Sequence, residues 1–305
     1  MINYGDHFRQ FFACDGLLSF VMIGYRNIRK RLYMKNNTYR VLALDLDGTL
    51  TNEKKEVTAR TKEAIRRAIE AEVAVVLATG RPLIGVMPVA RELGLDTLGG
   101  YILCYNGALI LECRSNAPVF QRHLPADAVR NICDWARNKP VYPLAYDAYG
   151  VITPYPDNRY VHKEAYNNGL SIRLVEDLPG FITCPIEKMM LVGEPSDVQA
   201  AIQELKARFG GKLNIFGSEP PFIEVLPPEV DKAFALDVLL KHLGATREEL
   251  IACGDGMNDV PMLRIAGAAV AMGNAAAAVK AFASFVTRSN EEDGVAHAIE
   301  RFIGI

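Results

Sequence analysis

Four short polar segments of this chain carry the groups that phosphoryl transfer requires. They are Asp45-Leu46-Asp47-Gly48-Thr49, Thr79-Gly80, Lys232 and Gly254-Asp255-Gly256-Met257-Asn258-Asp259. Carboxylates can hold a hard divalent cation, while a hydroxyl, an ammonium and glycine backbone N–H groups can bind phosphate oxygens. If the fold brings these segments together, the pattern predicts a phosphoryl-transfer site.

The elements that must position these segments are strands. Apolar runs typical of strands buried on both faces span residues 41–44, 73–78, 102–104 and 250–253, and a polar motif follows each of them. Residues 58–69 have the spacing of an amphipathic helix capped by Thr58. Loops at the carboxyl ends of parallel strands converge, so distant segments can share one pocket. The pattern predicts an α/β fold, a Rossmann-like parallel sheet with helices on both faces.

The middle of the chain does not continue this pattern of buried strands followed by polar motifs, and it contains aromatic and proline-rich stretches. We therefore expect a discontinuous core, residues 39–120 and 222–305, and an inserted α+β cap domain over 121–221. Further strands are expected at 186–192, 212–216 and 222–226, and a helix at 196–209 capped by Ser196. Some aromatic and basic side chains of the insert could line a substrate pocket, although packing inside the insert itself is the favoured interpretation. These are Tyr146, Tyr149, Tyr155, Arg159 and His162.

Composition narrows the class of protein. Half of the 305 residues are apolar, the formal net charge is −2, and charges of both signs are interspersed. A nucleic-acid binder would have a one-signed basic surface, so we expect small-molecule partners and infer no protein partner. The six cysteines form no Cys-x-x-Cys pair, which favours reduced thiols and a cytoplasmic location. The five histidines suggest neither a zinc site nor a catalytic triad.

Residues 1–38 differ from the rest and are interpreted as an N-terminal extension of unknown role. An apolar stretch at 17–25 is too short to span a bilayer, and basic residues follow it, the reverse of a secretory signal. A peripheral membrane anchor is the less favoured alternative to a nonessential extension or a functional start near Met34. No chemistry and no membrane partner are assigned to it.

The four motifs, in this order and spacing, resemble those of the haloacid dehalogenase superfamily. Asn106-Gly107-Ala108 and the large insert resemble its Cof-type phosphatases, whose cap is a sizeable α/β module. The resemblance covers residues 39–305, with one departure: Ala233 stands where glycine usually follows the motif-three lysine. It implies a Mg²⁺-dependent phosphatase acting on sugar phosphates or on phosphorylated cofactors such as pyridoxal phosphate or flavin mononucleotide.

The roles expected of the carboxylates follow from the chemistry of phosphate monoesters. An anionic nucleophile can attack a phosphate dianion only if a cation screens the charge, which makes Asp45 the nucleophile that forms an aspartyl phosphate. Asp47 can protonate the leaving alkoxide and later deprotonate water. Mg²⁺ is expected to bind Asp45, the main-chain carbonyl of Asp47, and Asp255. Asp259 is expected to orient metal-bound water or Lys232.

A second set is expected to bind the transferring phosphoryl group: Leu46 through its backbone amide, Thr79, Gly80, Lys232 and Asn258. Two neighbouring residues remain open. Arg81 can contact substrate or pair at the surface, and Asn106 is favoured as a turn-stabilising side chain over a ligand. Two other functions also remain open, a phosphosugar mutase and a metal- or phosphate-binding relative without turnover.

Overall fold

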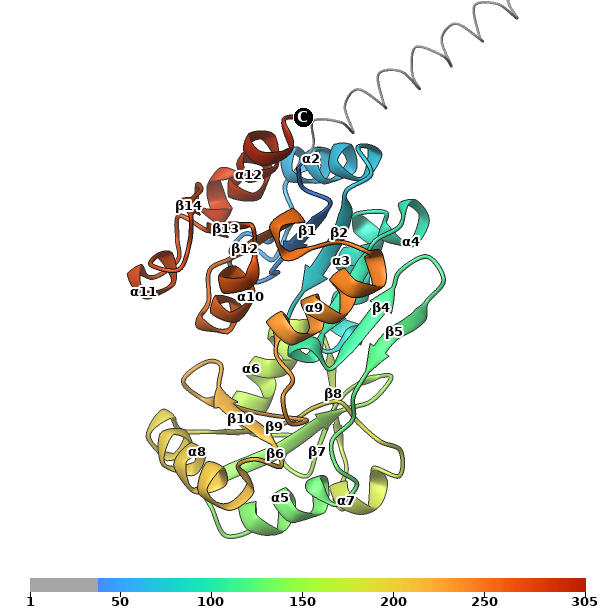
Figure 1. Ribbon diagram of the computed structural model, residues 1–305. Helices are drawn as coiled ribbons and strands as arrows, with labels where there is room; N and C mark the ends of the chain where they lie inside the picture. The colour runs from blue at the N-terminus through green and yellow to red at the C-terminus, as the bar shows by residue number, and fades with distance from the viewer. Residues whose placement is uncertain (1–37) are drawn as a thin grey trace, which may run out of the picture. The chain divides into compact units, whose positions relative to one another are not determined.

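The computed structural model describes residues 38–305, which form two β-sheets with helices packed on them (Figure 1). The expectations for residues 1–37 lie outside this range. Neighbouring strands of the first sheet are parallel from β14 to β3, and β4 and β5 add antiparallel strands at one edge. In spatial order the strands are β14 (Phe285–Val286), β13 (Ala268–Ala271), β12 (Leu250–Gly254), β1 (Val41–Leu44), β2 (Ala74–Ala78), β3 (Tyr101–Cys104), β4 (Leu109–Glu112) and β5 (Ala117–Gln121). The predicted α/β fold class is confirmed.

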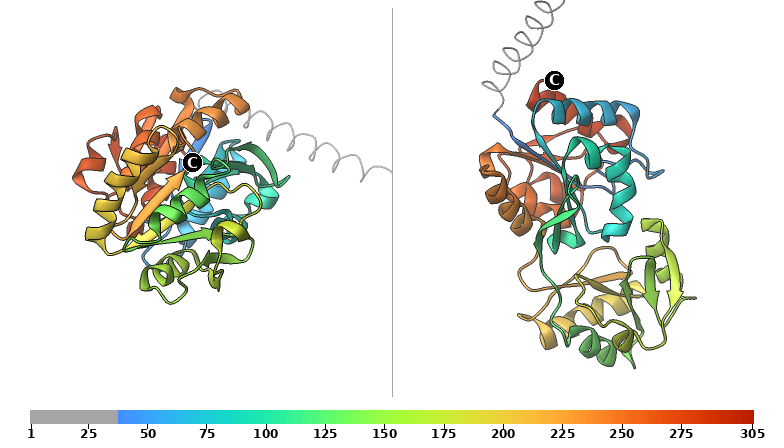
Figure 2. Two further views of the ribbon diagram at one scale, coloured as in Figure 1. Left: turned by 90° about the horizontal axis from the view of Figure 1, so that it is seen from below. Right: turned by 90° about the vertical axis from the view of Figure 1, so that its right-hand side faces the viewer.

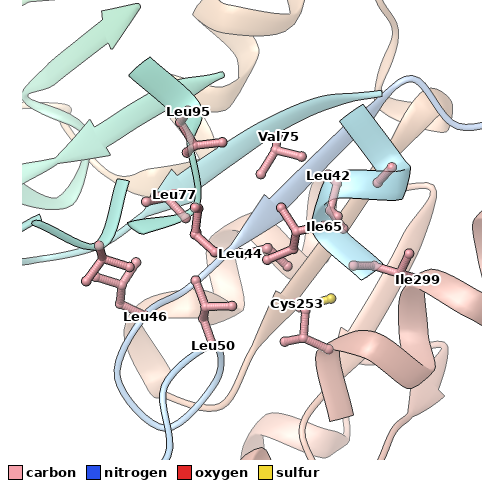
Figure 3. Packing of buried hydrophobic residues seen from close by; sticks show 14 of the residues in the cluster. Leu42, Leu44, Leu46, Leu50, Ile65, Val75, Leu77, Leu95, Cys253 and Ile299 are labelled. Atoms are coloured by element: carbon pink, nitrogen blue, oxygen red, sulfur yellow. The ribbon is translucent and has the colours of Figure 1, made fainter. Parts of the chain in front are cut away.

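Both faces of the first sheet are covered by helices. Successive strand side chains point to opposite faces, so Leu42 and Leu44 pack on one side and Val41 and Ala43 on the other. On the Leu44 side lie α2 (Ala59–Glu70), α3 (Leu83–Glu92) and α12 (Gly294–Ile303) (Figure 3). On the opposite side lie α9 (Lys232–Leu243) and α10 (Val260–Ile265). This two-sided burial explains why the strands are continuous apolar runs.

The helix predicted after the first strand is confirmed as α2. Its cap is Thr58, whose side-chain oxygen accepts a hydrogen bond from the backbone N–H of Thr61 at 3.2 Å. Shorter elements complete this part of the chain: α4 (Leu95–Leu98), α11 (Ala277–Lys280) and the 3₁₀ turns η1 (Tyr105–Gly107), η2 (Arg247–Glu249), η3 (Met257–Asp259) and η4 (Asn290–Glu292). No helix in the described range is long and apolar enough to cross a membrane.

The second sheet is mixed and is formed by the middle of the chain. In spatial order it contains β10 (Asn214–Gly217), β11 (Phe222–Leu226), β9 (Met189–Gly193), β6 (Val141–Tyr146), β7 (Gly150–Thr153) and β8 (Ser171–Leu174). Its helices are α5 (Ala128–Ala136), α6 (Arg159–Asn168), α7 (Leu178–Phe181) and α8 (Pro195–Phe209). Two chain segments join it to the first sheet (Figure 2, right). An α+β cap inserted in the core, as the sequence predicted, describes this arrangement.

Two details of the insert differ from the sequence-based expectation. Strand β11 pairs with β9 and β10, so the core cannot begin at Phe222, where we had placed its second part. A mostly apolar run of five residues such as β11 could belong to either sheet, and only the strands with which it pairs show that it belongs to the second. Helix α8 begins at Pro195 after the N-cap Glu194, not at a Ser196 cap. Proline fits the first helical turn because its fixed φ suits the helix and its missing N–H would have no helical partner.

The two faces of the second sheet have different surroundings. Met189 and Leu191 of β9 pack with α5 and α8, while Met190 and Val192 pack with α6. Phe222 and Tyr146 belong to the α6 side, which also contacts Tyr105 from the first sheet's loops. The α6 side of the second sheet therefore faces the polar loops of the first.

Candidate active site

The polar motifs converge on one cavity of about 220 Å³ at the carboxyl ends of the first sheet's strands. The predicted site residues that line it are Asp45, Asp47, Thr79, Gly80, Asp255, Asn258 and Asp259. The second sheet contributes Glu164 and Asn168 from α6, Lys188 from the residue before β9, and Glu224 from β11. The cavity is therefore enclosed by residues of both sheets.

A buried ammonium joins two of the carboxylates. The Nζ of Lys232 lies 2.6 Å from Asp45 Oδ1 and 2.6 Å from Asp259 Oδ1, and the lysine side chain has no exposed surface. Lys232 is the first residue of α9, where Asp231 caps the helix by accepting from the N–H of Phe234 at 2.7 Å. Ala233 takes a helical position in this first turn, which alanine favours. Burial lowers the pKa of Lys232, but the charges of Asp259 and Asp45 outweigh it and the net shift is upward.

The loop after β12 carries Asp255 and Asp259, and further hydrogen bonds fix both carboxylates. Asp259 Oδ2 accepts from the backbone N–H of Asp255 at 3.0 Å and of Gly256 at 2.9 Å. Asp255 Oδ1 accepts from the Thr49 hydroxyl at 2.7 Å. Both oxygens of Asp259 are thus engaged by the protein, whereas Asp255 lines the cavity with an oxygen that no other described residue is seen to bind.

These carboxylates form the kind of group that holds a divalent cation. One oxygen of each of Asp45, Asp255 and Asp259 lies within 4.8 Å of the others. Burial, followed by the negative charge of Asp259, raises the pKa of Asp45 well above its usual range, and burial raises the pKa of Asp255 to about 6. A cation would offset both effects by stabilising the ionised carboxylates. The oxygen donors and their electrostatics fit a hard ion such as Mg²⁺.

Gly48 permits the close approach of the first and last motifs. Its φ is +80°, and a Cβ at this position would lie 2.4 Å from Asp255 Oδ2. Any other residue would therefore be strained in the backbone and would displace the Asp255 carboxylate. The glycine after Asp47 is thus required by the geometry of the cavity.

Asp47 is held by two cations. Arg81 donates from Nε to Oδ2 at 2.7 Å and from Nη2 to Oδ1 at 2.6 Å, and Lys55 Nζ donates to Oδ1 at 2.7 Å. Burial favours a raised pKa of Asp47, but the hydrogen bonds and charges of Arg81 and Lys55 prevail, so its pKa is lowered. This ion pair is largely buried on the arginine side, and Arg81 also lines the cavity, so its contact with a substrate stays a prediction. Lys55 was not singled out from the sequence.

Of the expected phosphate-binding residues, Thr79, Gly80 and Asn258 line the same cavity, whereas Leu46 and Lys232 are not among its lining residues. Thr79 is buried, and Gly80 follows it at the end of β2. Asn258 is exposed at the rim in η3. Leu46 packs its side chain into the hydrophobic core, and its backbone lies in the turn between Asp45 and Asp47. The backbone N–H of Asn106 donates to the Thr79 carbonyl at 3.0 Å, while its side-chain Oδ1 is buried with no hydrogen bond among the described residues, so the role of this side chain stays a prediction.

The side chains singled out in the insert are not the ones that line the cavity. Tyr149, Tyr155, Arg159 and His162 are absent from its lining, and Tyr149 is 76% exposed. Tyr146 is buried and donates its hydroxyl to Glu164 Oε1 at 2.6 Å.

The insert residues that do line the cavity had a signal in the sequence that we did not use. Lys188 and Glu224 are charged residues at buried positions of otherwise apolar strand runs. Such charges are rarely buried unless they are paired. Glu164, on α6, lacked even this signal.

Comparison with known proteins gives a consistent picture. The sequence profile of haloacid dehalogenase-like hydrolases matches residues 42–299. The crystal structure of a haloacid dehalogenase-like hydrolase from Bacteroides thetaiotaomicron is 44% identical in sequence, has a TM-score of 0.82, and matches over 86% of this chain and 99% of its own.

Two curated relatives are phosphatases by name. The 5-amino-6-(5-phospho-D-ribitylamino)uracil phosphatase YcsE of Bacillus subtilis (strain 168) is 31% identical over 266 residues, 87% of this chain and 96% of its own. The HMP-PP phosphatase of Serratia proteamaculans (strain 568) is 28% identical over 269 residues, 87% and 96% of the two chains. The similarity therefore spans both sheets and the whole cavity.

Proposed function

Because the chain belongs to the haloacid dehalogenase-like hydrolases, as a phosphoric monoester hydrolase of the Cof type, we propose that it hydrolyses small phosphate monoesters through an aspartyl phosphate on Asp45. Sugar phosphates and phosphorylated cofactors are the proposed substrates. The observation that carries the proposal is the buried Asp45 carboxylate, which touches Lys232 and lies beside Asp255 at the base of the cavity. The small cavity supports a small-molecule ester over a protein substrate.

In the first step an oxygen of Asp45 attacks phosphorus, and the bond from phosphorus to the ester oxygen breaks. Asp47 donates a proton to the departing oxygen, which leaves as an alcohol. Arg81 and Lys55 favour the ionised form of Asp47. Before Asp47 can act as an acid, its carboxylate must therefore leave these two cations and take up a proton. The transferring phosphoryl oxygens would accept hydrogen bonds from Thr79, the backbone N–H of Gly80 and Asn258.

In the second step water attacks phosphorus, and the bond between phosphorus and Asp45 breaks to release phosphate. Asp47, now a carboxylate, accepts the proton of the water. The ion pair with Arg81 suits this half of the cycle, because it keeps the carboxylate ionised and fixed at the cavity wall. The ammonium of Lys232 stabilises the negative charge that develops around Asp45.

We propose Mg²⁺ as the cofactor, held by Asp45, Asp255 and the main-chain carbonyl of Asp47. When bound it would screen the charge between nucleophile and phosphate and stabilise the transition state. Asp259 is proposed to support the site indirectly, because Lys232 and two backbone N–H groups already occupy its oxygens. A cytoplasmic location is also proposed, supported by the free thiols of Cys104, Cys113, Cys133, Cys184 and Cys253.

Replacing the nucleophile tests the proposal. Phosphate release from a panel of phosphorylated metabolites is measured with Mg²⁺ for the wild type and for Asp45→Asn. We expect release by the wild type and loss of at least about a thousandfold in the variant, since an amide cannot form the covalent intermediate. Unchanged release by Asp45→Asn would overturn the mechanism. Formation of an isomer of the substrate without free phosphate would identify a phosphosugar mutase instead.

A further inference from the structure

One buried lysine of the second sheet reaches across to the first. Lys188 precedes β9, and its side chain is only 2% exposed. Its Nζ lies 2.7 Å from Glu224 Oε2 and donates to the backbone carbonyl of Gly80 at 2.9 Å. Because side chains alternate along a strand, Lys188 lies on the same face as Met190 and Val192, the face directed at the first sheet.

The bond from Lys188 to Gly80 completes the hydrogen bonding of the loop that follows β2. Three successive carbonyls of this loop accept hydrogen bonds, and two of the donors belong to the first sheet's own turn. The Thr79 carbonyl accepts from the N–H of Asn106 at 3.0 Å, and the Arg81 carbonyl accepts from the N–H of Tyr105 at 3.0 Å. The carbonyl between them, that of Gly80, is bound by the ammonium of Lys188. The Gly80–Arg81 peptide is therefore held at its carbonyl by the second sheet, while its N–H donates to Thr79 Oγ1 within the loop at 3.1 Å.

The surroundings of Lys188 hold its side chain in place. A buried ammonium is costly unless it is paired, and Glu224, which is itself 4% exposed, supplies the opposite charge. The ammonium also lies over the ring of Tyr146, 5.4 Å from its centre. These contacts hold the lysine head at one point of the cavity wall, so it acts as a fixed donor to the loop.

We propose that Lys188 is a positioning residue for phosphoryl transfer, which holds the Thr79–Arg81 loop in the orientation that aims the Thr79 hydroxyl and the Gly80 N–H at the phosphoryl group. The inference rests on the proposed function, because it names how the second sheet takes part in that same site. It also gives the second sheet a part in transition-state stabilisation, in addition to enclosing the substrate.

The test uses the full chain with Mg²⁺ and p-nitrophenyl phosphate as a generic ester. In the variant Lys188→Met/Glu224→Gln the bond to Gly80 is lost and no unpaired carboxylate is left behind. Lys139→Met is the matched control, because Lys139 also pairs with a glutamate, Glu204, and lies over an aromatic ring, that of Trp135. We expect kcat/KM to fall about tenfold or more in the double variant, since a misplacement of about 1 Å can cost a hundredfold, and to stay unchanged in the control.

Coupling to Thr79 separates a positioning role from direct substrate contact. In a Thr79→Val background the hydroxyl is already missing and only the contribution of the Gly80 N–H remains, so the double substitution should lower kcat/KM by a smaller factor than it does in the wild type, because residues that act as a unit are not additive. Fully additive losses would overturn the proposal and indicate that Lys188 binds the substrate by itself.

Hydrogen exchange adds a readout that does not depend on turnover. Backbone amides in a peptide covering residues 79–85 should exchange faster in the double variant than in Lys139→Met, because the loop loses its tie to the second sheet. Equal exchange together with wild-type kcat/KM would refute the positioning role. If the wild type itself released no phosphate from this ester or from the metabolite panel, the proposed function would fail instead, a result distinct from either outcome for Lys188.

Discussion

Replacing Gly48 by alanine should damage the metal site more than the fold. The residue has a φ of +80°, and a Cβ would lie 2.4 Å from Asp255 Oδ2. Ordinary contacts of a Cβ begin near 3.4 Å, so the carboxylate has to move by about 1 Å. That movement would break the 2.7 Å hydrogen bond from Thr49 and pull Asp255 away from Asp45.

The two consequences of the substitution differ in size. An alanine with a left-handed φ costs about 1–2 kcal/mol of folding free energy. A displaced carboxylate affects catalysis more strongly, because a shift of about 1 Å at a reacting site can lower the rate about a hundredfold. We expect a drop of about that size in kcat/KM and a higher Mg²⁺ concentration for half-maximal activity.

A second glycine provides the matched control for this experiment. Gly244 ends α9 with a φ of +61°, and a Cβ there would have no atom within 4 Å. Gly244→Ala should therefore lose similar stability in thermal unfolding without any change in kcat/KM or in Mg²⁺ dependence. If Gly48→Ala matched this control within twofold in both kinetic measures, the position of Asp255 would not matter to catalysis and the reasoning would be refuted.

Three further predictions concern charge. Lys232→Met leaves Asp45 and Asp259 buried without their cation, so the free energy of unfolding measured without metal should fall by about 3–5 kcal/mol. Added Mg²⁺ should restore part of this loss. Chelation of divalent metal should abolish phosphate release, and Mg²⁺ should restore it; full activity in excess chelator would contradict the metal assignment. Burial raises the pKa of Glu164 from 4.5 to about 7. Between these two pH values Glu164 is protonated in the folded state and ionised in the unfolded state, so the free energy of unfolding should fall by about 3 kcal/mol as pH rises from 4.5 to 7. Glu164→Gln should flatten that part of the profile in pH-dependent chemical denaturation.

The sequence predicted the first sheet and the reacting groups because both follow from strong local constraints. A strand buried on both faces has to be a continuous apolar run, and the polar residue that ends it marks the carboxyl edge of the sheet. The positions of Asp45, Thr79 and Asp255 at one edge could therefore be predicted from the sequence alone. The close approach of Gly48 to Asp255 could not be predicted, because it depends on two loops some two hundred residues apart in sequence.

The second sheet was predicted less well because its pattern is weaker. Its strands are paired mostly antiparallel, and short apolar runs such as 222–226 fit either sheet until their partners are known. Which face of β9 is turned to the first sheet depends on how the whole insert is docked, so the role of Lys188 could not be read from its spacing. The ion pair of Arg81 with Asp47 likewise joins loops after different strands.

The charge of the cavity explains why metal and substrate binding should depend on each other. With their carboxylates ionised, Asp45, Asp255 and Asp259 carry two more negative charges than Lys232 offsets, in a largely buried site. A phosphate dianion brought into that site would be strongly repelled, because a buried site holds little water to screen the negative charges from one another. A divalent cation held by Asp45 and Asp255 would reduce the repulsion, so by linkage each ligand should raise the affinity for the other. Burial first, and the charge of Asp259 second, raise the pKa of Asp45, and a cation bound beside these groups would favour its ionised carboxylate.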